Sequence, residues 1–381
     1  MIILTLNSGS SSLKFGLFDT QGVDVRAVMS GEKTGRTLRA SDASGTALPD
    51  VSLADDNPIT AVGIIRNLVS QAAILAPQAI GHRVVHGGTG LREHCRIDDR
   101  VLEQLRLASA MSPLHAPAAI SMIEAAETAF PGLPQVACFD TTFHAGMPEV
   151  ARTLPLPRAL RDAGIQRFGF HGLSCESIVH QLGDECPARL IVAHLGSGSS
   201  VTAIRDGRSI DTSMGFTPSG GVLMGTRSGE LDPGVIIYLL REKGYDFASL
   251  EQLVDHQSGM LGISGVSGDM RRLHAAEIES RDCQLAVEMF YISVAKQIAA
   301  MMVSLGGLDL LVFTGGIGEH DGDTREEVCG RLACLGVELA ISGPRSASGN
   351  PAGFSSRCGI RVLMSEENNQ IARHAYRLLT T

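Results

Sequence analysis

Two copies of one local pattern, about half a chain apart, constrain this sequence more than any other feature. In the first copy, the apolar residues 2–6 lead into a Gly/Ser turn at residues 7–12 (NSGSSS), and a second apolar run follows. In the second copy, the β-forming residues 190–193 lead into residues 196–200 (GSGSS), again followed by an apolar run. One such hairpin is weak evidence, because ordinary turns share this composition. Two copies in corresponding places predict a duplicated fold with one hairpin in each half.

Both turns have the chemistry of an anion site. Glycine at the ends of a tight turn permits positive φ and lets a ligand touch the backbone. Serine hydroxyls and exposed backbone N–H groups favour phosphate there. Lys14 is the only charged residue in the run 13–18 that leaves the first turn. We therefore expect a phosphate-binding hairpin in each half.

Length and composition exclude several classes of protein. The 381 residues suit two domains better than one. A content of 44% hydrophobic and 19% charged residues is typical of a soluble globular protein. The net charge of −9, without a basic stripe, argues against a nucleic-acid partner. The apolar stretch 283–305 contains Glu288 and Lys296, so we expect a buried or interface helix and no membrane span.

The cysteines and the N-terminus indicate the compartment. The eight cysteines are scattered, with no CxxC pair and no zinc-ligand spacing, which favours reduced thiols in the cytosol. Met1 runs directly into an expected strand, which leaves no room for a signal peptide. We expect a cytoplasmic protein.

The rest of the chain predicts alternating strands and helices. Further strands are expected at residues 23–29, 79–88, 136–139, 308–313 and 360–364. Helices are expected at residues 59–73, 117–130, 233–242, 247–257, 283–305 and 366–379. Residues 31–58 are polar and should form a peripheral insertion, residues 211–232 and 342–357 should be loops, and residues 314–319 should form a glycine turn before a helix that begins near residue 324.

Charged residues lie where ligand sites of α/β proteins gather. Asp140 follows the expected strand 136–139, and Arg83 lies in an apolar strand beside a glycine pair. His171 is flanked by a Gly-rich turn, and Arg227 lies between two glycines of the loop 211–232. The glycine turn before the helix near residue 324 is a further anion or nucleotide cradle.

Taken together, these residues resemble the acetate kinases, of the acetate and sugar kinase, heat-shock and actin superfamily. The matching blocks, in the family's order, are LNSGSSSLKFGLFD, GHRVVHGG, SPLHAP, CFDTTFH, RFGFHG, AHLGSGSS, DTSMGFTP, MGTRSGELDPG, SGDMR, FTGGIGE and a final EENNQIA. The resemblance implies an α/β fold of two duplicated ribonuclease-H-like (actin-like ATPase) domains, with a nucleotide cleft between them. The implied domains are residues 1–142 with 369–381, and residues 143–368.

The resemblance also implies an activity. It is the reversible direct in-line transfer of a phosphoryl group between ATP and acetate, giving ADP and acetyl phosphate. The implied cofactor is Mg²⁺, with Mn²⁺ as an alternative, and the implied assembly is a homodimer without a nucleic-acid or membrane partner.

The family pattern assigns a role to each matching residue. Asn7 and Glu367 are the metal-binding positions. The implied catalytic residues are Arg83 and Arg227 beside the transferred phosphoryl, His171 as its stabiliser, Asp140 as the family's catalytic carboxylate, and His115. The family's small pocket for the acyl methyl group corresponds to Val85, Leu114, Phe170 and Pro218. Lys14 faces the nucleotide phosphates, and the other nucleotide-binding residues are His194, Leu195, Gly196, Ser197, Gly198, Asp269, Met270, Arg271, Gly315, Gly316, Ile317, Gly318 and Glu319.

The chemistry of phosphoryl transfer agrees with this assignment. The transition state spreads charge over equatorial oxygens, so positioned cations are the main requirement. Arginine can bind those oxygens bidentately. Acetate is already ionised at pH 7, so the nucleophile has no proton to lose. We therefore expect Asp140 to orient an arginine or the water of a metal ion and not to act as a general base.

The sequence departs from the family at three positions and leaves two alternatives. Ser197, Ala116 and Asn368 replace the usual Asn, Asn and Glu, which predicts a divergent but active member. One alternative is a propionate or butyrate kinase; Val85 favours acetate, because a smaller residue would enlarge the pocket. The other is a non-catalytic nucleotide-binding protein, which would not explain Arg83, His171 and Arg227 together.

Overall fold

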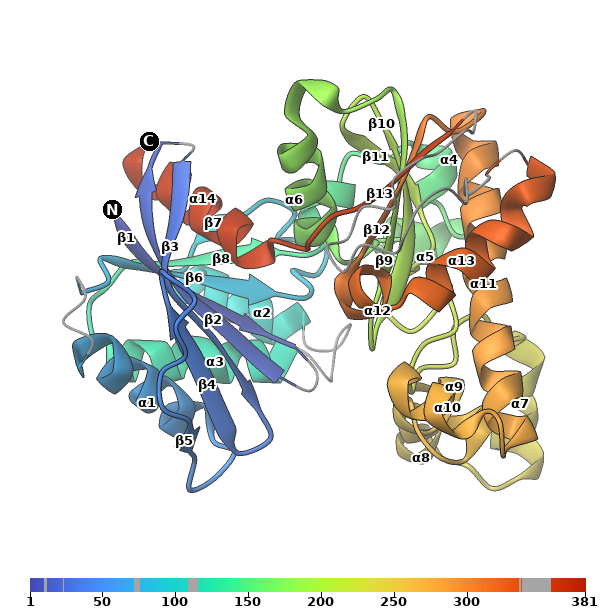
Figure 1. Ribbon diagram of the computed structural model, residues 1–381, viewed down its shortest axis with the longest axis horizontal. Coiled ribbons are helices and arrows are strands. Elements are labelled where there is room, and N and C mark those ends of the chain that lie inside the picture. Colours follow the sequence, from blue (N-terminus) through green and yellow to red (C-terminus); the bar gives the residue numbers. More distant parts are fainter. Residues whose placement is uncertain (10–11, 23, 72–75, 109–115, 336, 338–357) are drawn as a thin grey trace. The chain divides into compact units, whose positions relative to one another are not determined.

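The computed structural model divides into two compact units (Figure 1). The structure describes residues 1–381 except residues 10–11, 23, 72–75, 109–115, 336 and 338–357. The first unit comprises Met1–Ala145, Gly172–Ser177 and Glu366–Thr381, and the second comprises Gly146–His171 and Ile178–Ser365.

The first unit is built on a sheet with the strand order β5-β4-β3-β2-β1-β6-β8-β7. Its strands are β1 (Ile2–Ser8), β2 (Ser12–Gln21), β3 (Asp24–Thr34), β4 (Thr37–Asp42), β5 (Val51–Ser52), β6 (Ala79–Val84), β7 (Cys95–Arg96) and β8 (Gln135–Phe139). Its helices include α1 (Pro58–Gln71), α2 (Asp99–Ala108), α3 (Ala116–Ala129) and α14 (Glu367–Thr380).

Alternation along β1 explains how this sheet is covered on both faces. Successive side chains of a strand point to opposite faces. Leu4 and Leu6 pack into one cluster with residues of α1 and α3, whereas Ile3 packs into another with Ile371 and Ala375 of α14. Figure 1 shows α14 and the pair α1 and α3 along different sides of the sheet. The long apolar run of β1 therefore marks a central strand.

The second unit is built on a sheet with the order β11-β10-β9-β12-β13. Its strands are β9 (Arg189–Leu195), β10 (Ser199–Arg205), β11 (Arg208–Thr212), β12 (Leu310–Thr314) and β13 (Gly359–Val362). Its helices include α4 (Glu149–Arg152), α5 (Arg158–Asp162), α7 (Pro233–Glu242), α8 (Phe247–Gln252) with a π-helical turn at Leu253–Gln257, α9 (Gly259–Ser264), α10 (Met270–Ala276), α11 (Arg281–Leu305), α12 (Gly315–His320) and α13 (Gly322–Leu332). Helix α6 (Gly172–Leu182) begins in the first unit and ends in the second.

The two sheets share one topology. In the first unit β3, β2 and β1 are antiparallel neighbours, and β6 and β8 continue the sheet in parallel with β1. In the second unit β11, β10 and β9 are antiparallel, and β12 and β13 continue in parallel with β9. The hairpins β1–β2 and β9–β10 occupy equivalent places. The predicted duplication with one hairpin in each half is confirmed.

Helix α11 supplies the core of the second unit, as predicted for residues 283–305. By length and composition alone it could cross a membrane. Its buried side chains, among them Phe290, Val294 and Ile298, join one cluster with Ile191 of β9 and Phe313 of β12. Burial of this apolar surface against the sheet is the main source of stability there.

Two expectations about local structure are wrong. Residues 31–58 are not an insertion, because they extend β3 and form β4 and β5 at the sheet edge. Leu38 and Leu53 are buried there, so a few apolar residues suffice for an edge strand. Residues 314–319 are not a turn but belong mostly to α12, and the next helix begins at Gly322. Glu319 accepts a hydrogen bond from the Gly315 N–H at 2.9 Å, which stabilises this glycine-rich helix start.

A buried histidine gives the first unit a pH-dependent stability. His82 of β6 is 1% exposed, and its Nε2 lies 2.7 Å from Gln135 Oε1. Gln135 donates its amide N–H to Glu127, so its oxygen accepts the hydrogen bond from His82 Nε2. Burial lowers the pKa of His82 to about 4. Between about pH 6.5 and pH 4, His82 binds a proton in the unfolded chain but not in the folded chain. The free energy of unfolding therefore falls as the pH drops below about 6.5.

We predict that this histidine removes about 2 kcal/mol of unfolding free energy between pH 7 and pH 5. His82→Gln should lose that part of the pH dependence, whatever its stability at pH 7. Urea unfolding of both proteins at the two pH values measures the difference. Equal pH dependence in both would contradict the assignment of a neutral His82.

Candidate functional site

Four of the predicted site residues form one hydrogen-bonded chain in the first unit. Arg83 donates from Nε and Nη2 to Asp140 Oδ2 at 2.9 and 2.6 Å. It also donates from Nη1 to Asn7 Oδ1 at 3.3 Å. Asn7 Nδ2 then donates to Glu367 Oε2 at 2.8 Å. The order along the chain is therefore Asp140, Arg83, Asn7 and Glu367.

Strand order explains why these residues meet. β1, β6 and β8 are parallel neighbours, so their carboxyl ends lie at one edge of the sheet. Asn7 is near the end of β1, Arg83 is near the end of β6, and Asp140 directly follows β8. Glu367 is the first residue of α14, which packs on these strands.

The pair of Arg83 and Asp140 is largely withdrawn from water. Asp140 is fully buried and the Arg83 side chain is 13% exposed. Burial raises the pKa of Asp140, the charge of Arg83 acts against this, and the nearby Glu367 adds to it. For Arg83, burial alone would lower the pKa, but the carboxylates of Asp140 and Glu367 raise it above its ordinary value. Arg83 is therefore a fixed cation at this edge of the sheet.

One oxygen of this chain has no partner. Asp140 Oδ1 is buried and makes no well-formed hydrogen bond to the residues that the structure describes, although the nearby Leu173 N–H helps to lower the pKa of this carboxyl. A buried acceptor left unpaired costs about 1–3 kcal/mol, so a ligand that satisfies it would bind with that advantage. The carboxylates of Asp140 and Glu367 and the amide oxygen of Asn7 are the hard donors that a divalent cation such as Mg²⁺ prefers. These residues fit a metal ion.

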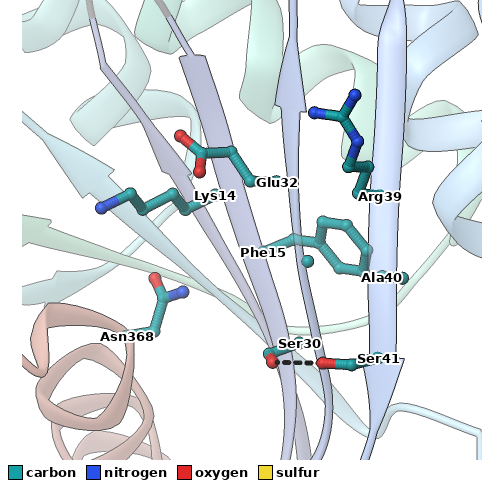
Figure 2. A pocket seen from close by; sticks show the side chains of 9 residues that line it. Lys14, Phe15, Ser30, Glu32, Arg39, Ala40, Ser41 and Asn368 are labelled. Carbon is teal, nitrogen blue, oxygen red and sulfur yellow. Dashed lines mark hydrogen bonds between the residues drawn. The ribbon is translucent and has the colours of Figure 1, made fainter. Parts of the chain in front are cut away.

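A pocket of about 420 Å³ lies beside these residues in the first unit (Figure 2). Lys14 pairs with Asn7 in the β1–β2 register and with Glu32 in the β2–β3 register. Figure 2 shows Lys14 and Asn368 directed towards the same space. Asn368 Oδ1 is buried without a hydrogen bond to the described residues. The pocket therefore offers the cation of Lys14, whereas the Asn368 oxygen is covered by other atoms.

The second unit brings His171, His194, Gly198 and Arg227 together. The rings of His171 and His194 stack with centroids 4.2 Å apart, and His171 Nδ1 lies 3.1 Å from Ser200 Oγ. A side-chain carbon at Gly198 would lie 3.1 Å from Arg227 Nη1 and 3.4 Å from His171 Nε2. Glycine at this position therefore lets the β9–β10 turn lie close to both groups, and a larger residue would crowd Arg227 Nη1.

The backbone at His171 is unusual. His171 has φ of 57° and stands immediately before α6. A non-glycine residue in this left-handed region carries a conformational cost that persists where the surroundings impose it. The ring is 8% exposed, so this conformation places a buried imidazole beside Arg227.

The predicted nucleotide-binding segments pack through their backbones. Gly225 donates its N–H to the Ser197 carbonyl at 3.2 Å. A side-chain carbon at Gly315, where φ is 77°, would lie 2.7 Å from the Leu195 carbonyl oxygen. A carbon at Gly225 would lie 3.0 Å from the Gly268 carbonyl oxygen. The turn at residues 194–198 therefore adjoins both the start of α12 and the loop before α10.

Two acidic residues of these segments serve their own helices. Asp269 is the N-cap of α10 and accepts from the Arg271 N–H at 3.0 Å, while the Arg271 side chain is 90% exposed. Met270, the first residue of α10, is buried. Glu319 Oε1 accepts from the Gly315 N–H and from the Ser365 N–H, each at 2.9 Å. Its carboxylate holds the start of α12, to which Gly316, Ile317 and Gly318 belong.

The residues predicted for the acyl pocket are divided between the units. Val85 follows β6 in the first unit and is half-buried. Phe170 and Pro218 are buried in the second unit, where the Pro218 carbonyl accepts from Arg227 Nη1 at 3.4 Å. Leu114 and His115 lie outside the described residues.

Sequence reasoning missed four polar side chains. Ser200, the partner of His171, belongs to the predicted hairpin but receives no role from its composition. His94, Glu176 and His374 gather in the first unit with ligand atoms within 4.8 Å of one another. These three residues come from distant parts of the chain and belong to no motif, so no pattern in the sequence joins them.

Comparisons with known proteins agree on one family. Residues 2–373 match the Acetokinase family. An acetate kinase of Rhodopseudomonas palustris is 40% identical, over 99% of this chain and 98% of that protein. A propionate kinase structure from Francisella tularensis has a TM-score of 0.86 at 33% identity, with 99% of each chain covered. The acetate kinase structure from Entamoeba histolytica has a TM-score of 0.85 at 30% identity over 100% of each chain. These likenesses confirm the predicted duplicated actin-like fold.

The buried ion pair makes a prediction about stability. Arg83→Met should lower the unfolding free energy by about 3–5 kcal/mol, because it leaves the Asp140 carboxylate buried and unpaired. Adding Asp140→Asn should restore much of this loss, because it removes the uncompensated charge. Denaturant unfolding of the two single variants, the double variant and the parent protein measures the coupling. Additive losses would contradict the pairing.

Proposed function

The chain belongs to the acetokinase family, and we propose that it transfers a phosphoryl group reversibly between ATP and acetate. The products in one direction are ADP and acetyl phosphate. The observation that carries this proposal is the buried chain of Asp140, Arg83, Asn7 and Glu367, because it fixes a cation and an unsatisfied carboxylate oxygen at one sheet edge. The enzyme is a phosphotransferase with a carboxyl group as acceptor.

Positioned charge is the main catalytic device that we propose. The transferred phosphoryl group carries its charge on three equatorial oxygens in a loose, in-line transition state. Arg83 and Arg227 can each bind such oxygens with a planar pair of N–H groups. His171 adds a hydrogen-bond donor beside Arg227. The fixed partners of Arg83 mean that its guanidinium needs little reorganisation when that charge develops.

We propose that Asn7, Glu367 and Asp140 Oδ1 hold Mg²⁺, with Mn²⁺ as an alternative. When bound, this ion neutralises charge on the phosphate oxygens. Lys14 and the turn at residues 194–198 would bind the nucleotide phosphates. The helix starts at residues 269–271 and 315–319 would bind the nucleoside, with Glu319 acting through its hold on the start of α12.

Asp140 is proposed to position charge and not to accept a proton. Its Oδ2 is occupied by two N–H groups of Arg83, so this oxygen has little free basicity. Acetate is ionised at neutral pH, so it has no proton for a base to remove. Asp140 therefore orients Arg83 through Oδ2 and presents Oδ1 to the metal.

The acceptor is the finer part of the proposal. Val85 narrows the predicted acyl pocket, which favours acetate over a longer acid. One solved neighbour is a propionate kinase, so propionate is the acid to compare with acetate. His115 and Leu114 complete the proposed acceptor site by the family pattern alone.

The proposal extends to the assembly and the compartment. We propose a homodimer in the cytoplasm that binds neither nucleic acid nor membrane, with domains at residues 1–142 plus 369–381 and at residues 143–368. Exposed apolar side chains on α7 and α11, including Ile237, Tyr238 and Ile292, support a subunit interface in the second unit.

A coupled assay for acid-dependent ADP formation tests the function. We expect kcat/KM for acetate to exceed that for propionate by about 10-fold or more, because one methylene in a tight pocket costs ~1–3 kcal/mol. Val85→Ala should narrow this gap. Higher activity with propionate or butyrate than with acetate would replace acetate by that acid.

Arg227 provides the control for that assay. Arg227→Ala should lower kcat/KM by roughly 100-fold or more, and Arg227→Lys should recover little, because lysine lacks the planar fork. Equal activity in the Arg227→Ala variant and the parent protein would place the reaction elsewhere.

The role of Asp140 is tested by Asp140→Asn at several Mg²⁺ concentrations. We expect kcat to fall by roughly 100-fold in both directions, because the variant loses charge next to Arg83 and the metal. The Mg²⁺ concentration for half-maximal rate should rise, and excess Mg²⁺ should restore part of the activity. An acid limb in the pH profile that only Asp140→Asn removes, with unchanged Mg²⁺ dependence, would show that Asp140 transfers a proton.

A further inference from the structure

Three side chains outside the proposed site form a compact cluster in the first unit. His94 precedes β7, Glu176 lies in α6 and His374 lies in α14. His374 Nε2 lies 2.8 Å from Glu176 Oε2, and His94 Nε2 lies 3.8 Å from the same oxygen. The two rings are in contact, with centroids 4.0 Å apart. Both histidine side chains are at most 5% exposed, and that of Glu176 is 28% exposed.

The outer nitrogens of both rings already accept hydrogen bonds. His94 Nδ1 accepts from the Phe139 N–H at 3.0 Å. Arg377 Nη2 lies 3.3 Å from His374 Nδ1, and a guanidinium can only donate. The proton of each neutral ring is therefore on Nε2, the nitrogen that faces Glu176. Gln370 Nε2 also lies 3.2 Å from His374 Nε2, but an amide N–H cannot donate to a protonated nitrogen, so the shorter, charge-assisted contact with the carboxylate assigns the proton.

This proton arrangement disfavours a metal ion in the cluster, although the spacing of the ligand atoms would allow one. A metal-binding imidazole normally donates its other N–H to an acceptor. Here that N–H would meet the Phe139 N–H or the guanidinium of Arg377. Burial raises the pKa of Glu176, but the hydrogen bonds and proximity of His374 and His94 prevail and lower it. Glu176 is thus an ionised acceptor that both rings face.

The cluster joins the elements that carry the proposed metal ligands. His94 holds the N–H of Phe139, the residue before Asp140. The Gly172 N–H, one helical turn before Glu176, donates to the Asp140 carbonyl at 2.9 Å. A side-chain carbon at Gly172 would lie 2.2 Å from that carbonyl oxygen, so the helix start is in tight contact with Asp140.

The same cluster fixes α14. His374 comes seven residues after Glu367, which places both on one face of the helix two turns apart. At the start of that helix, the Glu366 N–H donates to Ser177 Oγ of α6 at 3.3 Å. Glu176 and Ser177 therefore tie α6 to two levels of α14.

We propose that His94, Glu176 and His374 are positioning residues that set Asp140 and Glu367 at the separation needed to share one divalent cation. The inference rests on the proposed metal-binding roles of those two residues. Glu176 is the centre of the cluster, because it is the acceptor that both rings face. Its removal leaves Asp140 and Glu367 intact but breaks one of the two links between α6 and α14, and leaves only the Ser177 contact at the helix start.

Two variants of Glu176 separate a hydrogen-bond role from other roles. Glu176→Ala removes the acceptor, whereas Glu176→Gln supplies an amide oxygen in the same place. Glu127→Ala is the matched control, because Glu127 also accepts two hydrogen bonds in this unit, from Gly132 and Gln135 at 3.0 Å each. His374→Phe is the second variant, because it keeps a ring beside His94 and removes the donor to Glu176 together with the acceptor of Arg377.

The first readout is binding of Mn²⁺–ADP, followed by the paramagnetic resonance of the bound ion without acetate. We expect Glu176→Ala and His374→Phe to raise the dissociation constant by roughly 10-fold, as for other residues that orient metal ligands. Glu176→Gln should stay within about 3-fold of the parent protein, since it restores the acceptor. Glu127→Ala should bind as the parent protein does.

The second readout is kinetic. Glu176→Ala should lower kcat by roughly 10–100-fold, because small misplacements of catalytic groups are costly, while KM for acetate stays within about 2-fold. Thermal unfolding shows whether each variant is folded. A lower melting temperature with unchanged Mn²⁺–ADP binding and kcat would reduce the cluster to a structural role and overturn the proposal. If Glu176→Ala does not fold, His374→Phe decides by the same criteria.

A zinc titration of the full chain tests the competing occupant. We expect the parent protein to hold no tightly bound Zn²⁺ at this cluster. Glu176→Gln should therefore leave the Zn²⁺ content unchanged. One equivalent bound in the parent protein and lost in Glu176→Gln would identify a metal site and overturn the proposal. A parent protein that is inactive with every acid would contradict the proposed function. It would leave the test of the cluster valid, because binding of Mn²⁺–ADP does not depend on turnover.

Discussion

The buried pair of Arg83 and Asp140 is the interaction on which the first unit's site depends. Two charges withdrawn from water must compensate each other and fill their remaining hydrogen-bonding capacity. Arg83 uses three of its five N–H groups on Asp140 and Asn7, whereas only Oδ2 of Asp140 forms hydrogen bonds with the residues that the structure describes. The unmet capacity is therefore concentrated at a single carboxylate atom. A fold that tolerates this cost gains a position at which a cation or its water is favoured.

Duplication supplies two equivalent hairpins, and each has taken a different use. The β1–β2 hairpin contributes side chains, because Asn7 and Lys14 face each other in its register. In the β9–β10 hairpin the useful residue has no side chain. Gly198 lets the backbone lie close to Arg227 and His171. The common topology thus fixes where the two turns lie. The residues in each turn determine whether it presents a charged side chain or lets its backbone lie close to neighbouring groups.

Much of this fold and site could be predicted because the signals are local. Apolar runs, glycine turns and the polar residues that end each strand mark β1, β6 and β8, and parallel strand order then brings Asn7, Arg83 and Asp140 to one edge. Edge strands β4 and β5 escaped prediction because an edge needs few apolar residues. Helix α12 escaped because the Glu319 side chain compensates a start rich in glycine. The cluster of His94, Glu176 and His374 depends on tertiary contacts alone, and no spacing in the sequence reports those.

The departures from the family pattern fall where the structure tolerates them. Ser197 contacts Gly225 through its carbonyl oxygen, a group that every residue has, so replacement of the family's Asn leaves this link unchanged. Asn368 directly follows Glu367 and lines the pocket of Lys14. A glutamate there would place a second negative charge beside the proposed metal ligand and across from Lys14. The amide keeps an acceptor oxygen without that charge, so Lys14 has one fewer carboxylate competing with a phosphate. On the proposed roles, this substitution weakens the electrostatic attraction of the site for the metal ion and strengthens that of Lys14 for the nucleotide phosphates. The two changes oppose each other, as expected for an enzyme that has diverged while keeping its reaction.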